Sequence, residues 1–533
     1  MIRSLLAFLL STFLVFRVNA QSQVAREQQP QVRAELVPTL IVVITVDQLL
    51  PEYFERYGAQ LTGGLGRVYR GGAVFTNAYH DHATTETAPG HASILSGRFP
   101  RSTGIVRNNA GVQDAQTPLI GAQGAGASPF RFRGSTLTDW LRSRTPSTRA
   151  LSVSGKDRGA ILPLGRARQS AYWYASNGHF TTSTYYRDTL PEWVRAFNDR
   201  KLPARMAGRP WKPLLAASSY PERDSIAAES GGKDFSFPHL LPADTSRATQ
   251  LFPNYPWLDE VTLEFALAGM RSLDLGNDAH TDVLAVSLSA TDYIGHQFGP
   301  DSREIHDQIL RLDRSLGAFV DTLYSIRDSA RVVIALTADH GVAPLPELRK
   351  GARRVDLSGI LKKQLRTLAA KGLDTSALRF DLGMLFIDRT AFGRAPAEAD
   401  AAVKAFAAEA RAHPAVLRVD LVHKLAADTA RDAIARRWFN SIPQDMPAEL
   451  VVTLRPYSVW DYGVPIAMHG SPHDYDAHVP VIFYGPPFAT GRYDTFVRVV
   501  DMAPTLAWIA DTQPTERLDG RVLRQALRRD AAK

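Results

Sequence analysis

The sequence predicts an α/β fold, with a mostly parallel central sheet sandwiched by helices and an inserted α+β subdomain. Three apolar runs of strand length lie at residues 40–46, 282–289 and 331–338, and an aspartate closely follows each run. Continuous Val, Ile and Leu runs indicate strands buried on both faces, as in parallel sheets. Apolar positions at helical spacing over 302–326 predict a long covering helix.

The three aspartates are Asp47, Asp292 and Asp339. His296 lies four residues after Asp292, and His340 follows Asp339 directly. Because ligands of open α/β sheets bind at the carboxyl ends of the strands, we expect these side chains to meet at one edge. Three carboxylates and two imidazoles can hold a pair of divalent metal ions, so the pattern predicts a two-metal hydrolase.

The periodic segments divide the chain. We assign the catalytic core to residues 37–343 and 461–525, with further strands expected at 149–154 and 479–484 and a closing helix at 502–511. Residues 344–460 form the inserted α+β subdomain, with an Ala-rich helix over 396–412 and a strand over 449–454. Pro396 suits the first turn of that helix because its missing N–H has no helical acceptor there.

The N-terminus has the pattern of a signal peptide over residues 1–20. A short basic start is followed by an apolar stretch and by Val18-Asn19-Ala20, a small-residue cleavage site. Cleavage after Ala20 would leave a polar, disordered lead-in over residues 21–36, and an uncleaved anchor is the alternative. No later segment looks membrane-spanning, so we expect a periplasmic or secreted protein without stable membrane insertion.

Composition restricts the partners. The 533 residues carry a formal charge of +8 without a dense Lys/Arg block, which argues against specific nucleic-acid binding. The chain has no cysteine. It therefore has no disulfide and no acylated cysteine, and any metal must be held by histidines and carboxylates.

Thr87 is the candidate nucleophile, with Thr84 and Thr85 as fallback candidates. It precedes Ala-Pro-Gly-His and a helical pattern, where an N-cap residue would lie. Free N–H groups at a helix N-terminus suit a phosphate. A helix cap without catalytic function is the alternative interpretation.

His469 can return to the same sheet edge, because it follows the inserted subdomain and precedes a strand. His473 and His478 are competitors for that role. The Tyr79-His80-Asp81-His82 segment also has metal-like spacing, although it is separate from the three strand ends. His91 is a further histidine near the candidate nucleophile.

Taken together, these residues resemble the alkaline phosphatase superfamily, in its type I phosphodiesterase and nucleotide pyrophosphatase-like branch. The resemblance rests on Thr-Ala-Pro-Gly-His (87–91), Ser-Ala-Thr-Asp-Tyr-Ile-Gly-His (289–296), Thr-Ala-Asp-His-Gly (337–341), Asp47 and His469, in family order. It implies an alkaline phosphatase-like fold and two zinc ions per chain. Asp292, His296 and His469 would hold one ion. Asp47, Asp339 and His340 would hold the other together with Thr87, on which a phosphothreonine intermediate would form.

Asn108, Lys156 and Arg158 resemble the phosphate-binding residues of the phosphate-irrepressible alkaline phosphatases that use threonine. Arginine offers paired hydrogen bonds to phosphate and lysine a mobile charge, which suits the doubly charged monoester. A surface cluster of Lys156, Asp157 and Arg158 is the alternative reading. The resemblance thus implies an exported zinc-dependent alkaline phosphatase acting on small phosphate monoesters.

Two other functions stay open. The same two-zinc core would serve a phosphodiesterase or nucleotide pyrophosphatase, and a non-catalytic phosphate-binding relative is the remoter alternative. A sulfatase is disfavoured, since no cysteine is available for conversion to formylglycine. The sequence leaves the oligomeric state open, and we favour a monomer.

Overall fold

The structure is a computed structural model that describes residues 37–393, 395–464 and 466–529. The predicted signal peptide and lead-in lie outside the described residues. Within these ranges, none of the helices combines the length and the apolar character needed to cross a bilayer.

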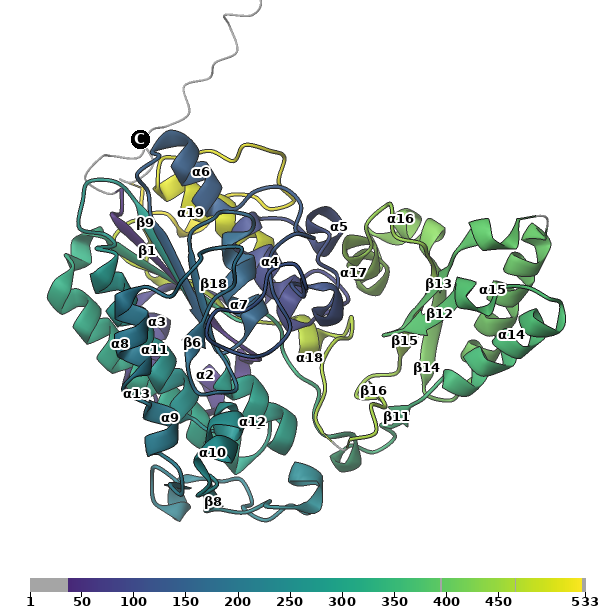
Figure 1. The fold of residues 1–533 in the computed structure, drawn as a ribbon, viewed down its shortest axis with the longest axis horizontal. Coiled ribbons are helices and arrows are strands. Elements are labelled where there is room, and N and C mark those ends of the chain that lie inside the picture. Colours follow the sequence, from purple (N-terminus) through teal and green to yellow (C-terminus); the bar gives the residue numbers. More distant parts are fainter. Residues whose placement is uncertain (1–36, 394, 465, 530–533) are drawn as a thin grey trace, which may run out of the picture.

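A nine-stranded sheet forms the centre of the larger body (Figure 1). Its strands, in spatial order, are β18 (Gly491–Tyr493), β2 (Ala73–Phe75), β17 (Val481–Tyr484), β10 (Val332–Thr337), β1 (Leu40–Val46), β9 (Asp282–Leu288), β4 (Ala150–Ser154), β5 (Ser170–Tyr174) and β6 (Phe180–Thr181). The five strands from β10 to β5 are parallel, and antiparallel pairing begins at β17 on one side and at β6 on the other. The predicted α/β class with a mostly parallel sheet is confirmed.

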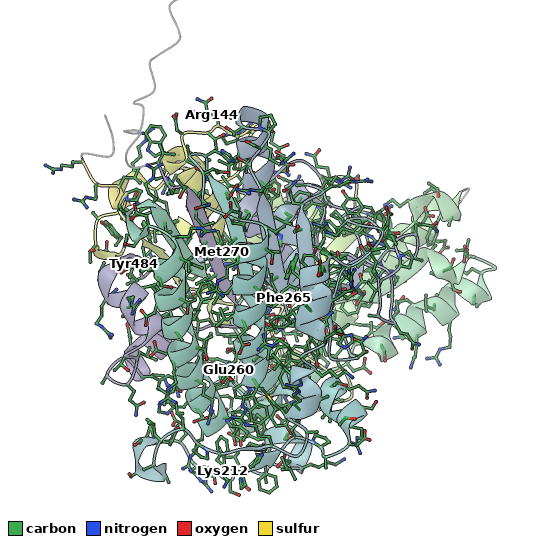
Figure 2. All side chains as sticks on the ribbon, turned by 60° about the vertical axis from the view of Figure 1, so that its left-hand side comes forward. Arg144, Lys212, Glu260, Phe265, Met270 and Tyr484 are labelled. Atoms are coloured by element: carbon green, nitrogen blue, oxygen red, sulfur yellow. The ribbon has the colours of Figure 1, made fainter. Side chains whose placement is uncertain are left out.

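Two groups of helices cover this sheet (Figure 1). One group comprises α3 (Gly64–Gly71), α8 (Glu192–Asn198), α11 (Trp257–Ser272) and α13 (Arg303–Ile326). The other comprises α4 (Thr87–Ser96), α6 (Leu137–Arg144), α7 (Asp157–Ile161) and α19 (Met502–Ile509). Figure 2 looks onto the first group, with Glu260, Phe265 and Met270 following one another along α11. The Phe265 side chain is fully buried, as expected for a helix whose apolar face covers β4 and β9.

The long helix expected over 302–326 is α13, which begins at Arg303 because the Ser302 hydroxyl caps it by accepting the N–H of Ile305. The helix expected over 396–412 is α15 (Pro396–Ala412).

A second, antiparallel sheet stands to one side of the large body (Figure 1). It has the order β12 (Leu378–Asp381), β13 (Met384–Ile387), β15 (Ala448–Leu454) and β14 (Val416–Leu421), and α15 and α14 (Ser358–Ala370) pack with it. These elements enclose an apolar core of their own, centred on Leu385, Phe406 and Leu450. We call this unit the four-stranded sheet.

The junction between the two bodies lies next to the segment that leads into α4. Helix α17 (Ala433–Ser441) contributes Ser441, whose hydroxyl accepts the N–H of Ala83 at 2.7 Å. Asn440 of the same helix donates to the carbonyl of Asp81 at 2.7 Å. The segment that leads into Thr87 is therefore fixed by hydrogen bonds to residues that lie far away in the sequence.

Candidate active site

The central strands bring the predicted residues to one edge of the sheet. Asp47 follows β1 directly, and Asp339 and His340 lie just beyond β10. Asp292 stands on the helix α12 (Ala290–Phe298), which begins two residues after β9. Lys156 follows the neighbouring strand β4. As expected for an open α/β sheet, these candidate ligands lie at the carboxyl ends of the parallel strands.

At this edge of the sheet, two groups of side chains have donor atoms close enough to hold a metal ion. Asp47, Asp339 and His340 have donor atoms within 4.8 Å of one another, and so do Asp292, His340 and His469. His296 lies beside the second group. Its Nε2 is 3.2 Å from Oδ1 of Asp292, the same oxygen that Nε2 of His469 approaches. His340 thus belongs geometrically to both groups, and the rings of His340 and His469 stack at 3.6 Å between centroids.

The three histidines share one orientation. Each Nδ1 donates to a backbone carbonyl: His296 to Ala467 at 2.6 Å, His340 to Gly341 at 2.9 Å and His469 to Thr85 at 2.8 Å. A hydrogen bond of this kind fixes the tautomer and leaves the Nε2 lone pair free for a metal. Burial lowers the pKa of His340 and of His469, which keeps both rings neutral and able to coordinate.

The site contains buried polar atoms that no protein group satisfies. Oδ1 of Asp47 and Nε2 of His340 are buried without a hydrogen-bond partner in the described chain. Burial, followed by the nearby charges of Asp292 and Asp339, raises the pKa of Asp47 well above its usual value. A cation would satisfy the free atoms and neutralise the carboxylates, so the residues fit a pair of divalent ions.

Thr87 is the first residue of α4 and not its cap. Glu86 occupies the N-cap position with an extended backbone, one residue earlier than the sequence predicted. Within the described chain the Thr87 hydroxyl has no hydrogen-bond partner. By contrast, the Thr85 hydroxyl donates to the Ser471 carbonyl at 2.9 Å, and the Thr84 hydroxyl is buried and unpaired.

The first turn of α4 offers fewer free N–H groups than the sequence suggested. The N–H of Ala88 donates to Oδ1 of Asn108 at 2.8 Å, and Pro89 has none. The N–H of Gly90 is bonded to the Glu86 carbonyl. An anion bound at this end of α4 would therefore have to be held mainly by side chains.

Lys156 lies between the two candidate metal groups. Its Nζ is 2.6 Å from Oδ2 of Asp47 and 2.5 Å from Oδ2 of Asp292. Burial opposes the charged form, but Asp292 and Asp47 outweigh it and raise the pKa of Lys156, so the ammonium stays charged. The alternative of an exposed surface cluster does not describe Lys156, which is 4% exposed.

Arg158 and Asn108 are the other two residues that resemble phosphate-binding residues in the sequence. Nη1 of Arg158 contacts only its neighbour Asp157, at 3.4 Å, and the buried Nε has no partner in the described chain. Asn108 is held by its N–H, which donates to Oε2 of Glu86 at 2.7 Å, and by its Oδ1, which accepts from Ala88. Both side chains thus retain donors for an anion.

The other histidines have local roles. Nε2 donates to a backbone carbonyl in His80 (Ala338), His473 (Leu454) and His478 (Thr76). His80 and His82 lie side by side, with ring centroids 5.1 Å apart, but belong to neither candidate metal group of the site.

Three residues that contact the predicted site residues were not themselves predicted from the sequence to take part. His91 reaches Oδ2 of Asp339 at 3.1 Å through Nδ1 and Ser287 at 2.9 Å through Nε2. Gln48 donates from Nε2 to Asp292 at 2.8 Å, with its own backbone in the left-handed region (φ 69°). Glu86 orients Asn108. The only available signal for Gln48 and Glu86 was their position beside Asp47 and Thr87.

The family model for type I phosphodiesterases and nucleotide pyrophosphatases matches residues 41–470. The chain belongs to the type I phosphodiesterase and nucleotide pyrophosphatase family. Alkaline phosphatase PhoV of Synechococcus elongatus is 31% identical to this family member over 98% of this chain and 99% of PhoV. Alkaline phosphatase PhoK of Sphingomonas sp. is 32% identical over 91% of each chain.

A solved structure of alkaline phosphatase PafA has the same fold. It superposes with a TM-score of 0.86 at 28% identity, covering 92% of this chain and 99% of PafA. A second PafA structure is a variant altered at one threonine, one asparagine, one lysine and one arginine.

Proposed function

We propose that this chain is an exported, zinc-dependent alkaline phosphatase that hydrolyses phosphate monoesters through a phosphothreonine at Thr87. The observation that carries the proposal is the contact between the start of α4 and one metal group. Nδ1 of His91 lies 2.9 Å from the Thr87 carbonyl and 3.1 Å from Oδ2 of Asp339. The first turn of α4, which carries Thr87, thereby lies against the candidate metal group that contains Asp339.

The residues fit two zinc ions. Asp292, His296 and His469 would hold one, and Asp47, Asp339 and His340 the other, beside Thr87. Bound there, the ions would supply a lowered pKa for the Thr87 hydroxyl and neutralise charge on the leaving oxygen. Histidine and carboxylate ligands also accept manganese or cobalt, so elemental analysis of the purified protein tests the choice of zinc.

The chain's own residues would perform the remaining tasks. Thr87 Oγ would attack phosphorus as the bond from phosphorus to the ester oxygen breaks and the alcohol departs. Water would then attack the phosphothreonine, which breaks the bond from Oγ to phosphorus and releases inorganic phosphate. Asn108, Lys156 and Arg158 bind the non-bridging oxygens, which carry more charge in a monoester than in a diester. The four residues altered in the PafA variant have the types and the order of Thr87, Asn108, Lys156 and Arg158. The Thr-to-Asn and Lys-to-Arg spacings are the same in both chains, whereas the Asn-to-Lys spacing differs, and this partial match supports these roles.

Phosphodiester or pyrophosphate hydrolysis is the second candidate, because the matching family model is named for those activities. PhoV, PhoK and PafA, to which this chain is similar, are alkaline phosphatases. The position of Lys156 and Arg158 also favours a dianionic substrate.

Trapping of the intermediate tests the proposal. The zinc-loaded protein would be mixed with an aryl phosphate, quenched in acid and digested for mass spectrometry. We expect phosphate on Thr87 in the native protein and no phosphopeptide in Thr87→Ala. Phosphate on Thr84 or Thr85 would assign the nucleophile elsewhere. N-terminal sequencing of exported protein would test cleavage after Ala20.

A further inference from the structure

The four-stranded sheet reaches the candidate active site through a buried arginine. Arg107, which immediately precedes Asn108, is 4% exposed, and its Nη1 donates to Oδ2 of Asp381 at the end of β12. The guanidinium also lies over the ring of Phe386 in β13, 5.3 Å from its centroid. Val106 packs into the same apolar cluster as Phe386 and Met384. The backbone leading into Asn108 is therefore fixed by the four-stranded sheet.

Asn108 in turn depends on Glu86. Its N–H donates to Oε2 of Glu86 at 2.7 Å, and its side-chain oxygen accepts from Ala88 at 2.8 Å. These two bonds leave the Nδ2 donor for a phosphate oxygen. A shift of Glu86 would move the Asn108 backbone and therefore the direction of that donor.

Glu86 and Asp381 are the two carboxylates whose charges favour the buried Arg107 cation, Asp381 more strongly. Nη2 of Arg107 is buried and has no hydrogen-bond partner in the described chain. Without the Asp381 charge, Glu86 would be the remaining carboxylate of the two whose charge favours the guanidinium, and an unpaired buried charge is costly. Arg107 would then compete with the Asn108 N–H for the Glu86 carboxylate.

We propose that Asp381 is a positioning residue of the phosphate subsite, which holds Arg107 and so leaves Glu86 free to orient Asn108. The inference rests on the proposed function, because it assigns Asn108 to the substrate phosphate. It gives the four-stranded sheet a part in catalysis although its strands supply no residue to the metal groups.

The test compares Asp381→Asn with Asp420→Asn in the full-length, zinc-loaded protein. Asp420 is the matched control, since it pairs with Arg418 at 2.7 Å on β14 of the same sheet. We expect Asp381→Asn to lower kcat/KM for an aryl phosphate monoester about tenfold, through misplacement of Asn108. Asp420→Asn should stay within about twofold of the native value, and Asp381→Glu should recover part of the loss by restoring the charge.

A double-mutant cycle separates positioning from a general loss of structure. In the Asn108→Ala background, Asp381→Asn should cost no more than about twofold, because its target is already gone. An equal loss in both backgrounds would overturn the inference, as would an unchanged kcat/KM in the single variant. A similar loss in Asp420→Asn would also overturn it, by showing that any charge removed from the sheet has this effect.

Calorimetric binding of inorganic phosphate keeps the two proposals distinguishable. Asp381→Asn and Asn108→Ala should each weaken phosphate binding to the zinc-loaded protein, without additive loss in the double variant. If no monoester were hydrolysed but this binding pattern held, the proposed function would fail while the positioning role survived. Equal phosphate affinity in Asp381→Asn and the native protein would reject the positioning role alone.

Discussion

Gly90 lies directly against the backbone of Asp339. A Cβ at Gly90 would stand 2.2 Å from the carbonyl oxygen of Asp339 and 2.8 Å from its Cβ. No side chain fits in that space, so glycine allows α4 to pack on the end of β10. The contact explains in physical terms why a glycine lies three residues after Thr87, at the point where the helix meets a candidate metal ligand.

Gly90→Ala should therefore separate Thr87 from the metal groups. A displacement of about 1 Å can cost roughly 10²-fold in rate, and we expect a loss of that order in kcat/KM. Gly359→Ala is the control, because the Cβ at this position on α14 meets nothing within 4 Å. Activity and bound zinc would be measured for both variants. A fully active Gly90→Ala protein would contradict the packing argument.

Thr87→Ala should abolish turnover while leaving about two zinc ions per chain, because the other ligands are independent of the hydroxyl. Removing a nucleophile typically costs roughly 10⁵-fold or more in kcat. Thr87→Ser keeps a hydroxyl and should retain part of the activity. Steady-state rates and elemental analysis check the prediction, and substantial turnover by the alanine variant would refute the role of Thr87.

Lys156→Ala and Arg158→Ala should impair monoesters more than diesters. A charge-assisted hydrogen bond contributes about 1.5–3 kcal/mol, which corresponds to roughly 10–100-fold in kcat/KM for the substrate that uses it. The ratio of the two kcat/KM values, measured on matched aryl esters, is the readout. Equal losses of kcat/KM for the monoester and the diester would mean that these cations do not recognise the additional charge of the monoester.

Much of this site could be predicted because its signals are local. A buried strand followed by an aspartate places Asp47 and Asp339 without any knowledge of distant contacts. The role of Gln48 depends on Asp292, which is 244 residues away in the sequence. The position of Arg107 depends on Asp381, on a different sheet. Such pairings arise from tertiary packing, and neither composition nor periodicity carries them.

The N-cap of α4 shows a different limit of prediction from sequence. Thr is a strong N-cap residue, so propensity placed Thr87 at the cap, whereas Glu86 occupies it. Glu86 accepts from Asn108, which lies across a loop, and this long-range bond outweighs local preference. The free Thr87 hydroxyl follows from that shift, since a capping hydroxyl would be engaged with the backbone.

Glu229 should make stability depend on pH. Its side chain is 1% exposed with one oxygen unpaired in the described chain, and burial followed by the charge of Glu304 raises the pKa of Glu229 to about 9. Because its pKa is raised in the folded state, the protonated Glu229 contributes its full stability below the unfolded-state pKa of about 4.3. This contribution to the free energy of unfolding is lost as pH rises through the folded-state pKa. The melting temperature of the native protein should therefore fall relative to Glu229→Gln between about pH 4.3 and about pH 9, the unfolded and folded pKa values of Glu229.

The exposed Glu55 supplies the control for that comparison. Glu55→Gln should track the native protein across the same pH range. A constant offset between Glu229→Gln and the native protein would show that Glu229 does not titrate in this interval.

The most direct test of the proposed function is kcat/KM for a matched aryl phosphate monoester and diester. The mature protein would be assayed at alkaline pH with zinc restored and again after chelation. We expect a strong monoester preference that chelation abolishes and zinc restores. A preference for the diester would contradict the phosphatase assignment, and activity that survives chelation would contradict the two-metal site itself.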